Sequence, residues 1–162
     1  MAIDSREKGK RGEYLVRDAL RKKTAMQWER VPGSGAFGAN HGLKGDVYLP
    51  STEGHASRYC FEVKWYKDEQ LTSNILNNGV SQIEKWWDQT AREAVEMNLR
   101  PALVFKKDRG QWLVALDSED PLVSKLAEYH HVVFSKKDTT LVIGVFEVWL
   151  NKLSIEELVK TL

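Results

Sequence analysis

The feature that most constrains this chain is the eight-residue run YCFEVKWY at positions 59–66. Its aromatic and β-branched residues favour a strand. Side chains alternate between the two faces of a strand, so one face is apolar while Glu62 and Lys64 lie together on the other. The fold must therefore bury this strand and still accommodate two opposite charges. A cross-strand ion pair at the surface, which is common and contributes little, would explain the same tripeptide.

Length, composition and charge set broad limits. With 162 residues, of which 42% are hydrophobic, residues 1–162 suit one globular domain with a single core. The net charge of +1 favours no polyanionic partner, but residues 1–30 alone carry +4 and the remainder −3. A basic segment of this kind is typical of a solvated helix face or of an edge that binds phosphates.

Cysteine content and hydropathy bear on the compartment. Cys60 is the only cysteine, so an intramolecular disulfide cannot form. The first residues lack the apolar stretch of a secretory signal, and no run approaches the roughly 20 apolar residues that span a bilayer. We expect a protein of a reducing cytoplasm without a membrane partner.

Periodicity and turn residues predict both helices and strands. Apolar residues recur at helical spacing in residues 5–24 and 80–98, and a shorter helix is predicted at 122–129. Ser154 and Glu157 have the spacing of a capping box before an apolar stripe of Leu158 and Leu162. Strands are expected at 28–31, 46–49, 58–66, 102–106, 111–116, 131–134 and 141–149.

The turns between these strands predict their pairing. Residues 46–49 and 58–66 are expected to form an antiparallel hairpin through PSTEG, and residues 102–106 and 111–116 a second hairpin. These strands would belong to a sheet of four or five. Residues 33–45 contain five glycines and predict a surface loop.

Asp46 adds a second carboxylate beside the charged strand. It begins a strand directly after Gly45, and the first hairpin would bring it next to Glu62. Adjacent carboxylates repel each other unless a cation neutralises them. A site of two acids, a backbone carbonyl and waters suits a hard divalent ion, so we expect Mg²⁺, with Mn²⁺ as a substitute. Such an ion activates water for phosphodiester hydrolysis, and Lys64 would position that water and hold the scissile phosphate.

The pattern Asp46…Glu62-Val63-Lys64 resembles the core of the PD-(D/E)xK nuclease superfamily, although the proline position is not kept. Three short segments are similar, in order, to the archaeal-type Holliday-junction resolvases, and a fourth is similar to the glutamine-aromatic element of the wider superfamily. The segments are KGKRGE at 8–13, RVPGS at 30–34, CFEVK at 60–64 and QIEKW at 82–86. The resemblance implies a restriction-endonuclease-like α/β fold, with a mixed central sheet flanked by helices. It also implies that the protein works as a homodimer in the cytoplasm of a prokaryotic or phage-infected cell.

The resemblance also implies roles for individual residues. The metal would be held by Asp46, Glu62, Val63 through its carbonyl, and Glu13 as a further acid. The catalytic group would comprise Glu13, Asp46, Glu62, Lys64 and Ser34. DNA would be contacted by Arg11, Arg17, Arg30, Ser34, Phe37 and Gln82. Tyr14 stands where the family has an arginine, so Arg11 or Arg17 would take over that contact, and the loop between Ser34 and Asp46 is longer here.

Several of these residues have a simpler explanation. Glu13 has the spacing of an intrahelical ion pair with Arg17, and Gln82 suits a solvated helix surface. Phe37 would either stack on exposed bases or fold onto the core. Trp86 and Trp87 favour core packing, with a dimer contact as the alternative. The histidines match no zinc site.

The sequence thus predicts a Mg²⁺-dependent, structure-selective endonuclease that resolves four-way DNA junctions by symmetric cleavage as a homodimer. Specificity would come from the shape of the branched DNA and from phosphate contacts. One alternative is another PD-(D/E)xK nuclease of the restriction-like, flap or nicking kind. A non-catalytic DNA-binding module of the same fold is the other.

Overall fold

The structure is a computed structural model and describes residues 5–32 and 42–162 of the chain. The two long helices lie where the apolar spacing predicts them, as α1 (Ser5–Thr24) and α2 (Gln82–Met97). Val16 and Leu20 form the buried stripe of α1. Ser81 and Glu84 form a capping box that starts α2.

A seven-stranded mixed sheet forms the centre of the fold, larger than the four or five strands expected. Its order is β1-β2-β4-β5-β6-β8-β7. The strands are β1 (Glu29–Arg30), β2 (Val47–Tyr48), β4 (Tyr59–Tyr66), β5 (Arg100–Lys107), β6 (Leu113–Asp117), β7 (His131–Lys136) and β8 (Thr139–Val145). Strands β4 and β5 run parallel because α2 crosses over between them, and the other neighbours pair antiparallel.

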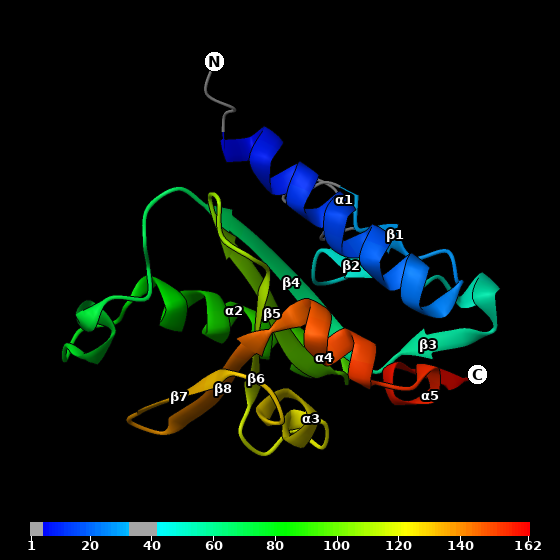
Figure 1. The fold of residues 1–162 in the computed structure, drawn as a ribbon. Helices are drawn as coiled ribbons and strands as arrows, with labels where there is room; N and C mark the ends of the chain where they lie inside the picture. Colours follow the sequence, from blue (N-terminus) through cyan, green and yellow to red (C-terminus); the bar gives the residue numbers. More distant parts are fainter. Residues whose placement is uncertain (1–4, 33–41) are drawn as a thin grey trace.

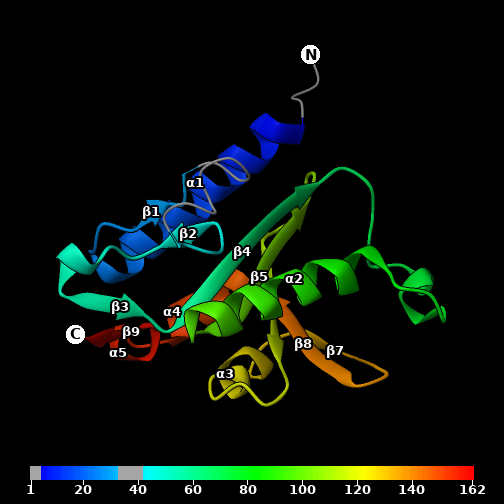
Figure 2. The same ribbon diagram turned by 180° about the vertical axis from the view of Figure 1, so that it is seen from behind.

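Helices cover both faces of this sheet (Figures 1 and 2). Helices α1 and α4 (Phe146–Lys152) lie over one face, and α2 lies over the other. Phe61 and Val63 of β4 pack in the core beneath α1 and α4. Ile83 and Trp87 of α2 pack in a second core on the opposite face. The predicted α/β class, with a mixed central sheet flanked by helices, is confirmed.

The link between β2 and β4 is not the simple turn expected at PSTEG. It contains a 3-10 helix, η1 (Ser51–Glu53), and β3 (His55–Ser57), which pairs with the C-terminal β9 (Val159–Thr161) in a separate two-stranded sheet. Strands β2 and β4 still pair antiparallel, as predicted, through Val47 and Phe61. Only the connection differs from the prediction: it includes a strand that pairs with β9 in place of a tight turn.

The same pairing shortens the C-terminal helix. The capping box of Ser154 and Glu157 is confirmed, but its helix, α5 (Ile155–Leu158), has only four residues. Leu158 is fully buried, whereas Leu162 is 68% exposed and belongs to no apolar stripe. The chain leaves the helix at Val159 because β3 offers it backbone hydrogen bonds.

The strand predicted over residues 141–149 is wrong beyond Val145. β8 ends there, and α4 follows directly. Phe146, Trp149 and Leu150 are buried at helical spacing, so a helix turns all three toward one core. Aromatic and β-branched residues favour strands locally, but core packing overrides that preference. The predicted short helix is present as α3 (Val123–Ala127). Among the described residues, no helix has the length and apolar character needed to cross a membrane.

Candidate active site

Glu62 and Lys64 project from β4 toward α2, away from the aromatic core of the strand. The side chain of Glu62 is 4% exposed and that of Lys64 is 26% exposed, and Nζ of the lysine lies 3.5 Å from Oε1 of the glutamate. The other oxygen of Glu62, Oε2, is buried and has no hydrogen-bond partner among the described residues. Such burial is inconsistent with a solvated surface ion pair, which was the simpler explanation of this tripeptide.

Asp46 reaches β4 through a turn that requires glycine. Gly45 has φ +79°, and a Cβ there would lie 2.9 Å from both Cys60 Sγ and the Phe61 carbonyl oxygen. The Asp46 amide donates to that same carbonyl at 2.8 Å. Its Oδ2 accepts a 2.7 Å hydrogen bond from the amide of Val63. The Asp46 carboxylate is therefore bound to the backbone between Glu62 and Lys64, which brings the three side chains together.

Glu13 approaches this place from α1. Its carboxylate pairs with Arg30 of β1, with 3.2 Å between Oε1 and Nε. The intrahelical alternative is not formed, because Arg17 pairs with Asp18 instead. The charge of Asp46 acts on Glu13, so the two acids belong to one electrostatic cluster.

The arginines near Glu13 gather around Tyr14, the residue that departs from the family pattern. The guanidinium groups of Arg17 and Arg30 lie 4.6 Å and 5.7 Å from the centre of the Tyr14 ring. Arg11 is instead 5.8 Å from the ring of Trp65. Of the two arginines considered as replacements at position 14, Arg17 is the one beside the Glu13–Arg30 pair.

Burial raises the pKa of all three carboxyl groups. Burial first, and then the charge of Asp46, raise the pKa of Glu62 to about 10. The same two causes raise the pKa of Glu13 to about 7. Burial also raises the pKa of Asp46, against the opposing effects of the Val63 hydrogen bond and the charge of Lys64. A cation that binds here must therefore displace protons, and its affinity should increase with pH.

Gln89 and Glu93 of α2 complete the polar network, and the sequence analysis missed both. Gln89 accepts a hydrogen bond from Lys64 at 3.2 Å and donates to Glu62 at 3.1 Å and to Glu93 at 3.4 Å. Oε2 of Glu93 is buried without a hydrogen-bond partner among the described residues, as is Oε2 of Glu62. The amide of Gln89 thus holds the lysine and the glutamate in their relative positions.

Gln82, the glutamine chosen from the sequence, lies elsewhere. It is the exposed first residue of α2, seven positions before Gln89. Seven residues are close to two helical turns, so both glutamines share a helix face about 10 Å apart. The i, i+4 pairing of Gln89 with Glu93 on the helix after β4 was the available signal. Trp87 is buried in the core and Trp86 packs against Tyr66, so core packing accounts for both.

Two further predicted residues, Ser34 and Phe37, lie outside the described residues. Their assigned contacts with DNA remain predictions.

The donors that converge here suit a hard divalent ion, although within residues 5–32 and 42–162 no three His, Cys, Asp or Glu side chains are arranged to hold one. Mg²⁺ commonly binds one or two carboxylates and fills its remaining positions with water and substrate phosphate. Asp46 and Glu62 supply two carboxylates, and Oε2 of Glu62 is a buried acceptor that an ion would satisfy. The Val63 carbonyl points to the same strand edge as the Val63 amide, which binds Asp46.

Removing the Gln89 amide should slow cleavage without unfolding the protein. We expect Gln89→Ala to lower the single-turnover rate by roughly 10- to 100-fold, because hydrogen bonds to charged groups contribute roughly 1.5–3 kcal/mol. Gln89→Glu should lower it further by placing a third carboxylate between Glu62 and Glu93. Asp88→Ala, an exposed neighbour on α2, is the control. A Gln89→Ala rate within twofold of the unmodified protein would contradict this role.

An aspartate bound to the backbone of a Glu-x-Lys strand within a mixed sheet defines the class of PD-(D/E)xK nucleases. The chain belongs to a family within that class, because residues 4–160 match the model described as "Phage putative PDDEXK endonuclease". It is 64% identical over 160 residues to Protein D14 of Escherichia phage T5, covering 99% of this chain and 100% of that protein.

Among solved structures, the chain is similar to Hjc of Archaeoglobus fulgidus, a Holliday junction resolvase from an archaeal hyperthermophile. The identity is 19% and the TM-score is 0.45, with 92% of this chain and 98% of that chain covered.

Proposed function

We propose that the protein is a Mg²⁺-dependent endonuclease that hydrolyses phosphodiesters in branched DNA, with the four-way junction as its preferred substrate. The observation that carries the proposal is the 2.7 Å hydrogen bond from Val63 to Asp46, because it holds both carboxylates beside Lys64. The preference for junctions is supported by three sequence segments, from KGKRGE at 8–13 to CFEVK at 60–64, which occur in the same order as in the archaeal-type resolvases that they resemble.

Each residue of the cluster has a chemical task in this proposal. Asp46, Glu62 and the Val63 carbonyl would hold the cation, with Glu13 acting through water, and Mn²⁺ would substitute for Mg²⁺. The bound ion supplies activation of water and neutralisation of phosphate charge. Lys64, which is more exposed than Glu62, would donate hydrogen bonds to the scissile phosphate. Arg30 would offset the negative charge on the non-bridging phosphate oxygens as the leaving oxygen departs.

DNA would be attracted mainly by α1, whose surface carries Lys and Arg along most of its length. In a homodimer, two such helices and two active sites would serve the two opposing strands of a junction. Phosphate contacts by Arg11, Arg17, Arg30 and Ser34, with Phe37 stacking on an unpaired base, would position the substrate. Because a phage protein is so similar, we place this activity in the cytoplasm of an infected cell.

Cleavage of a labelled immobile four-way junction tests the proposal directly. We expect paired, symmetric cuts with Mg²⁺, none with EDTA, and much slower cleavage of a linear duplex of matched sequence. Sedimentation should give a dimer, and junction affinity should fall steeply with salt. Equal cleavage of junction and duplex would instead favour a restriction-like or nicking enzyme. Binding without any cleavage, under Mg²⁺ or Mn²⁺, would favour a non-catalytic module.

A further inference from the structure

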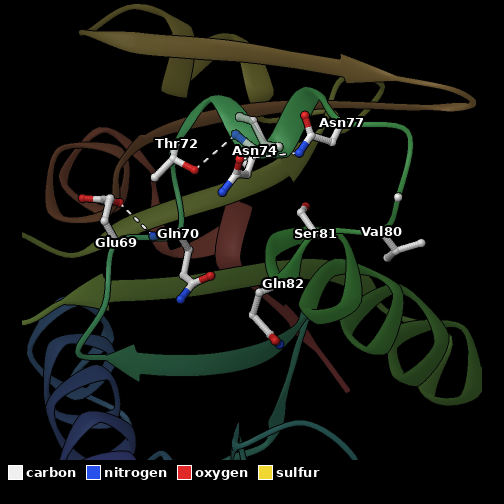
Figure 3. Close-up of a pocket in the computed structure, with 10 residues that line it drawn as sticks. Glu69, Gln70, Thr72, Asn74, Asn77, Val80, Ser81 and Gln82 are labelled. Carbon is white, nitrogen blue, oxygen red and sulfur yellow. Dashed lines mark hydrogen bonds between the residues drawn. The ribbon is translucent and has the colours of Figure 1, made fainter.

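A pocket of about 350 Å³ lies beside the first turn of α2 (Figure 3), and none of its lining residues belongs to the carboxylate cluster. It is formed by the segment that joins β4 to α2, residues 67–81, which includes the 3-10 helix η2 (Ser73–Leu76). Six lining side chains are uncharged amides or hydroxyls: Gln70, Thr72, Asn74, Asn77, Ser81 and Gln82. Figure 3 shows Gln70 and Gln82 extending to the same side of the pocket, while Asn74 and Asn77 lie together across it.

The segment is held in a defined shape. Lys136 of β7 donates to the Gly79 carbonyl and to Glu84, both at 2.7 Å. Lys137 donates to the Asn78 carbonyl at 3.2 Å. Leu71 and Ile75 pack against the core beneath α2. These contacts hold the backbone that carries the amide side chains of the pocket, which reduces the entropy cost of binding a ligand.

The chemistry of the pocket selects among ligands. Glu69, its one charged lining residue, already accepts hydrogen bonds from the amides of Gln70 and Leu71. The Ser81–Glu84 capping box occupies the start of α2, so the pocket offers no free helix end to a phosphate. Asn and Gln side chains both donate and accept hydrogen bonds, as base edges do. Neutral amides therefore suit base edges better than the phosphate backbone.

Apolar side chains stand exposed among these amides. Leu76, between Asn74 and Asn77 in the chain, is 68% exposed, and Val80 of the pocket wall is 55% exposed. Proteins that read the minor groove combine Asn or Gln contacts with apolar side chains that press between base steps. Leu76 ends the 3-10 helix η2 and lies near Asn74 and Asn77 in the chain, so this segment combines an exposed apolar side chain with amide side chains in the same way.

The segment also lies within reach of DNA held at the carboxylate cluster. It follows directly on β4, which carries Glu62 and Lys64, and ends at α2, which carries Gln89. Gln82 and Gln89 lie on one face of α2, about 10 Å apart. That distance corresponds to about three base-pair steps of 3.4 Å.

We propose that residues 70–82 form a minor-groove contact on the duplex arm about three base pairs from the scissile phosphate. In this contact Asn74, Asn77 and Gln82 bond to base edges, and Leu76 presses against the groove floor. The 2-amino group of guanine projects into the minor groove and would obstruct this approach, so the contact favours A·T pairs. This inference rests on the proposed function, because it takes the cluster at Glu62 as the place of the scissile phosphate.

The test measures binding and cleavage of junctions whose pairs two to four steps from the mapped cut, on either side, are A·T, G·C or inosine·C. Inosine·C resembles A·T in the minor groove and G·C in the major groove, because inosine lacks the 2-amino group. We expect A·T and inosine·C junctions to bind alike and G·C junctions roughly tenfold more weakly. Equal binding of all three, or inosine·C behaving as G·C, overturns the inference.

Two variants separate this contact from phosphate binding. In the Asn74→Ala/Leu76→Ala protein the A·T preference should disappear while the salt dependence of binding keeps its slope. Lys85→Ala, an exposed cation on the first turn of α2, should keep the preference if the inference holds. Asn151→Ala, exposed on α4, is the control for fold and activity. Retention of the preference in the double variant overturns the inference, whereas absence of any Mg²⁺-dependent cleavage overturns the proposed function itself.

Discussion

Replacing Glu62 by glutamine is expected to reduce Mg²⁺-dependent cleavage by about 10³-fold or more, which corresponds to a rise of about 4 kcal/mol in the activation barrier. The substitution keeps the shape of a side chain that is 4% exposed but removes its negative charge and one oxygen donor. Junction binding should persist, since the basic residues of α1 remain. The measurement is single-turnover cleavage beside binding in EDTA, with the exposed Glu119→Gln as control.

The same variant has an expected effect on stability. Burial raises the pKa of Glu62 from 4.5 to about 10, so in metal-free buffer the folded protein retains a proton that the unfolded chain releases above pH 4.5. Unfolding then becomes easier as pH rises through this range. Glutamine does not titrate, so in EDTA Glu62→Gln should be more stable than the unmodified protein at pH 8. The difference should shrink toward pH 5, and urea unfolding at both pH values measures it.

Two results would count against this account of Glu62. A variant that still cuts junctions at a tenth of the normal rate would show that the carboxylate is not part of the reaction. A stability difference that is the same at pH 5 and pH 8 would show that the group is not buried in its protonated form.

Gly45→Ala is expected to be the most damaging small substitution near the site. The left-handed backbone at φ +79° costs an alanine roughly 1–2 kcal/mol, and its Cβ would lie 2.9 Å from the Phe61 carbonyl oxygen. That carbonyl also accepts the Asp46 amide, so relief of the contact must move Asp46. A displacement of about 1 Å at a reacting group can cost about 10²-fold in rate. Urea unfolding and single-turnover cleavage measure the two effects.

Gly54 provides a matched control for this substitution. Its φ is +73°, close to that of Gly45, but a Cβ there would meet nothing within 4 Å. Gly54→Ala should therefore show the backbone cost alone and retain normal cleavage. If both variants lose the same stability and keep full activity, the turn at Gly45 does not position Asp46.

Much of the fold could be predicted from local patterns. The apolar stripe of α1, the strand at β4 and the Ser154 capping box depend on neighbours a few residues away, and the structure confirms them. Predictions of secondary structure were wrong where contacts with residues distant in the chain determined the local conformation. Residues 146–149 have strand propensity, but the core between α1 and the sheet required a helix.

In the candidate site, too, some residues were found from local sequence patterns and others only from tertiary contacts. The Glu-x-Lys pattern indicated a polar group on a buried strand, and Gly45-Asp46 indicated its partner. Gln89 and Glu93 were missed because they contact Glu62 only once α2 folds back across β4. Gln82 was chosen from its spacing to an aromatic residue, a spacing that does not encode which turn of α2 faces the carboxylates.

By itself the sequence determined most of the helices and strands and pointed to Asp46, Glu62 and Lys64 as candidate site residues, because helix and strand periodicity are local properties of the chain. Only the tertiary structure decided that Asp46 binds the backbone of β4 at Val63, that Glu13 pairs with Arg30 across two elements, and that Gln89 joins Lys64 to Glu62. Those contacts form when segments distant in the chain are brought together by burial of their apolar faces, which no short stretch of residues specifies.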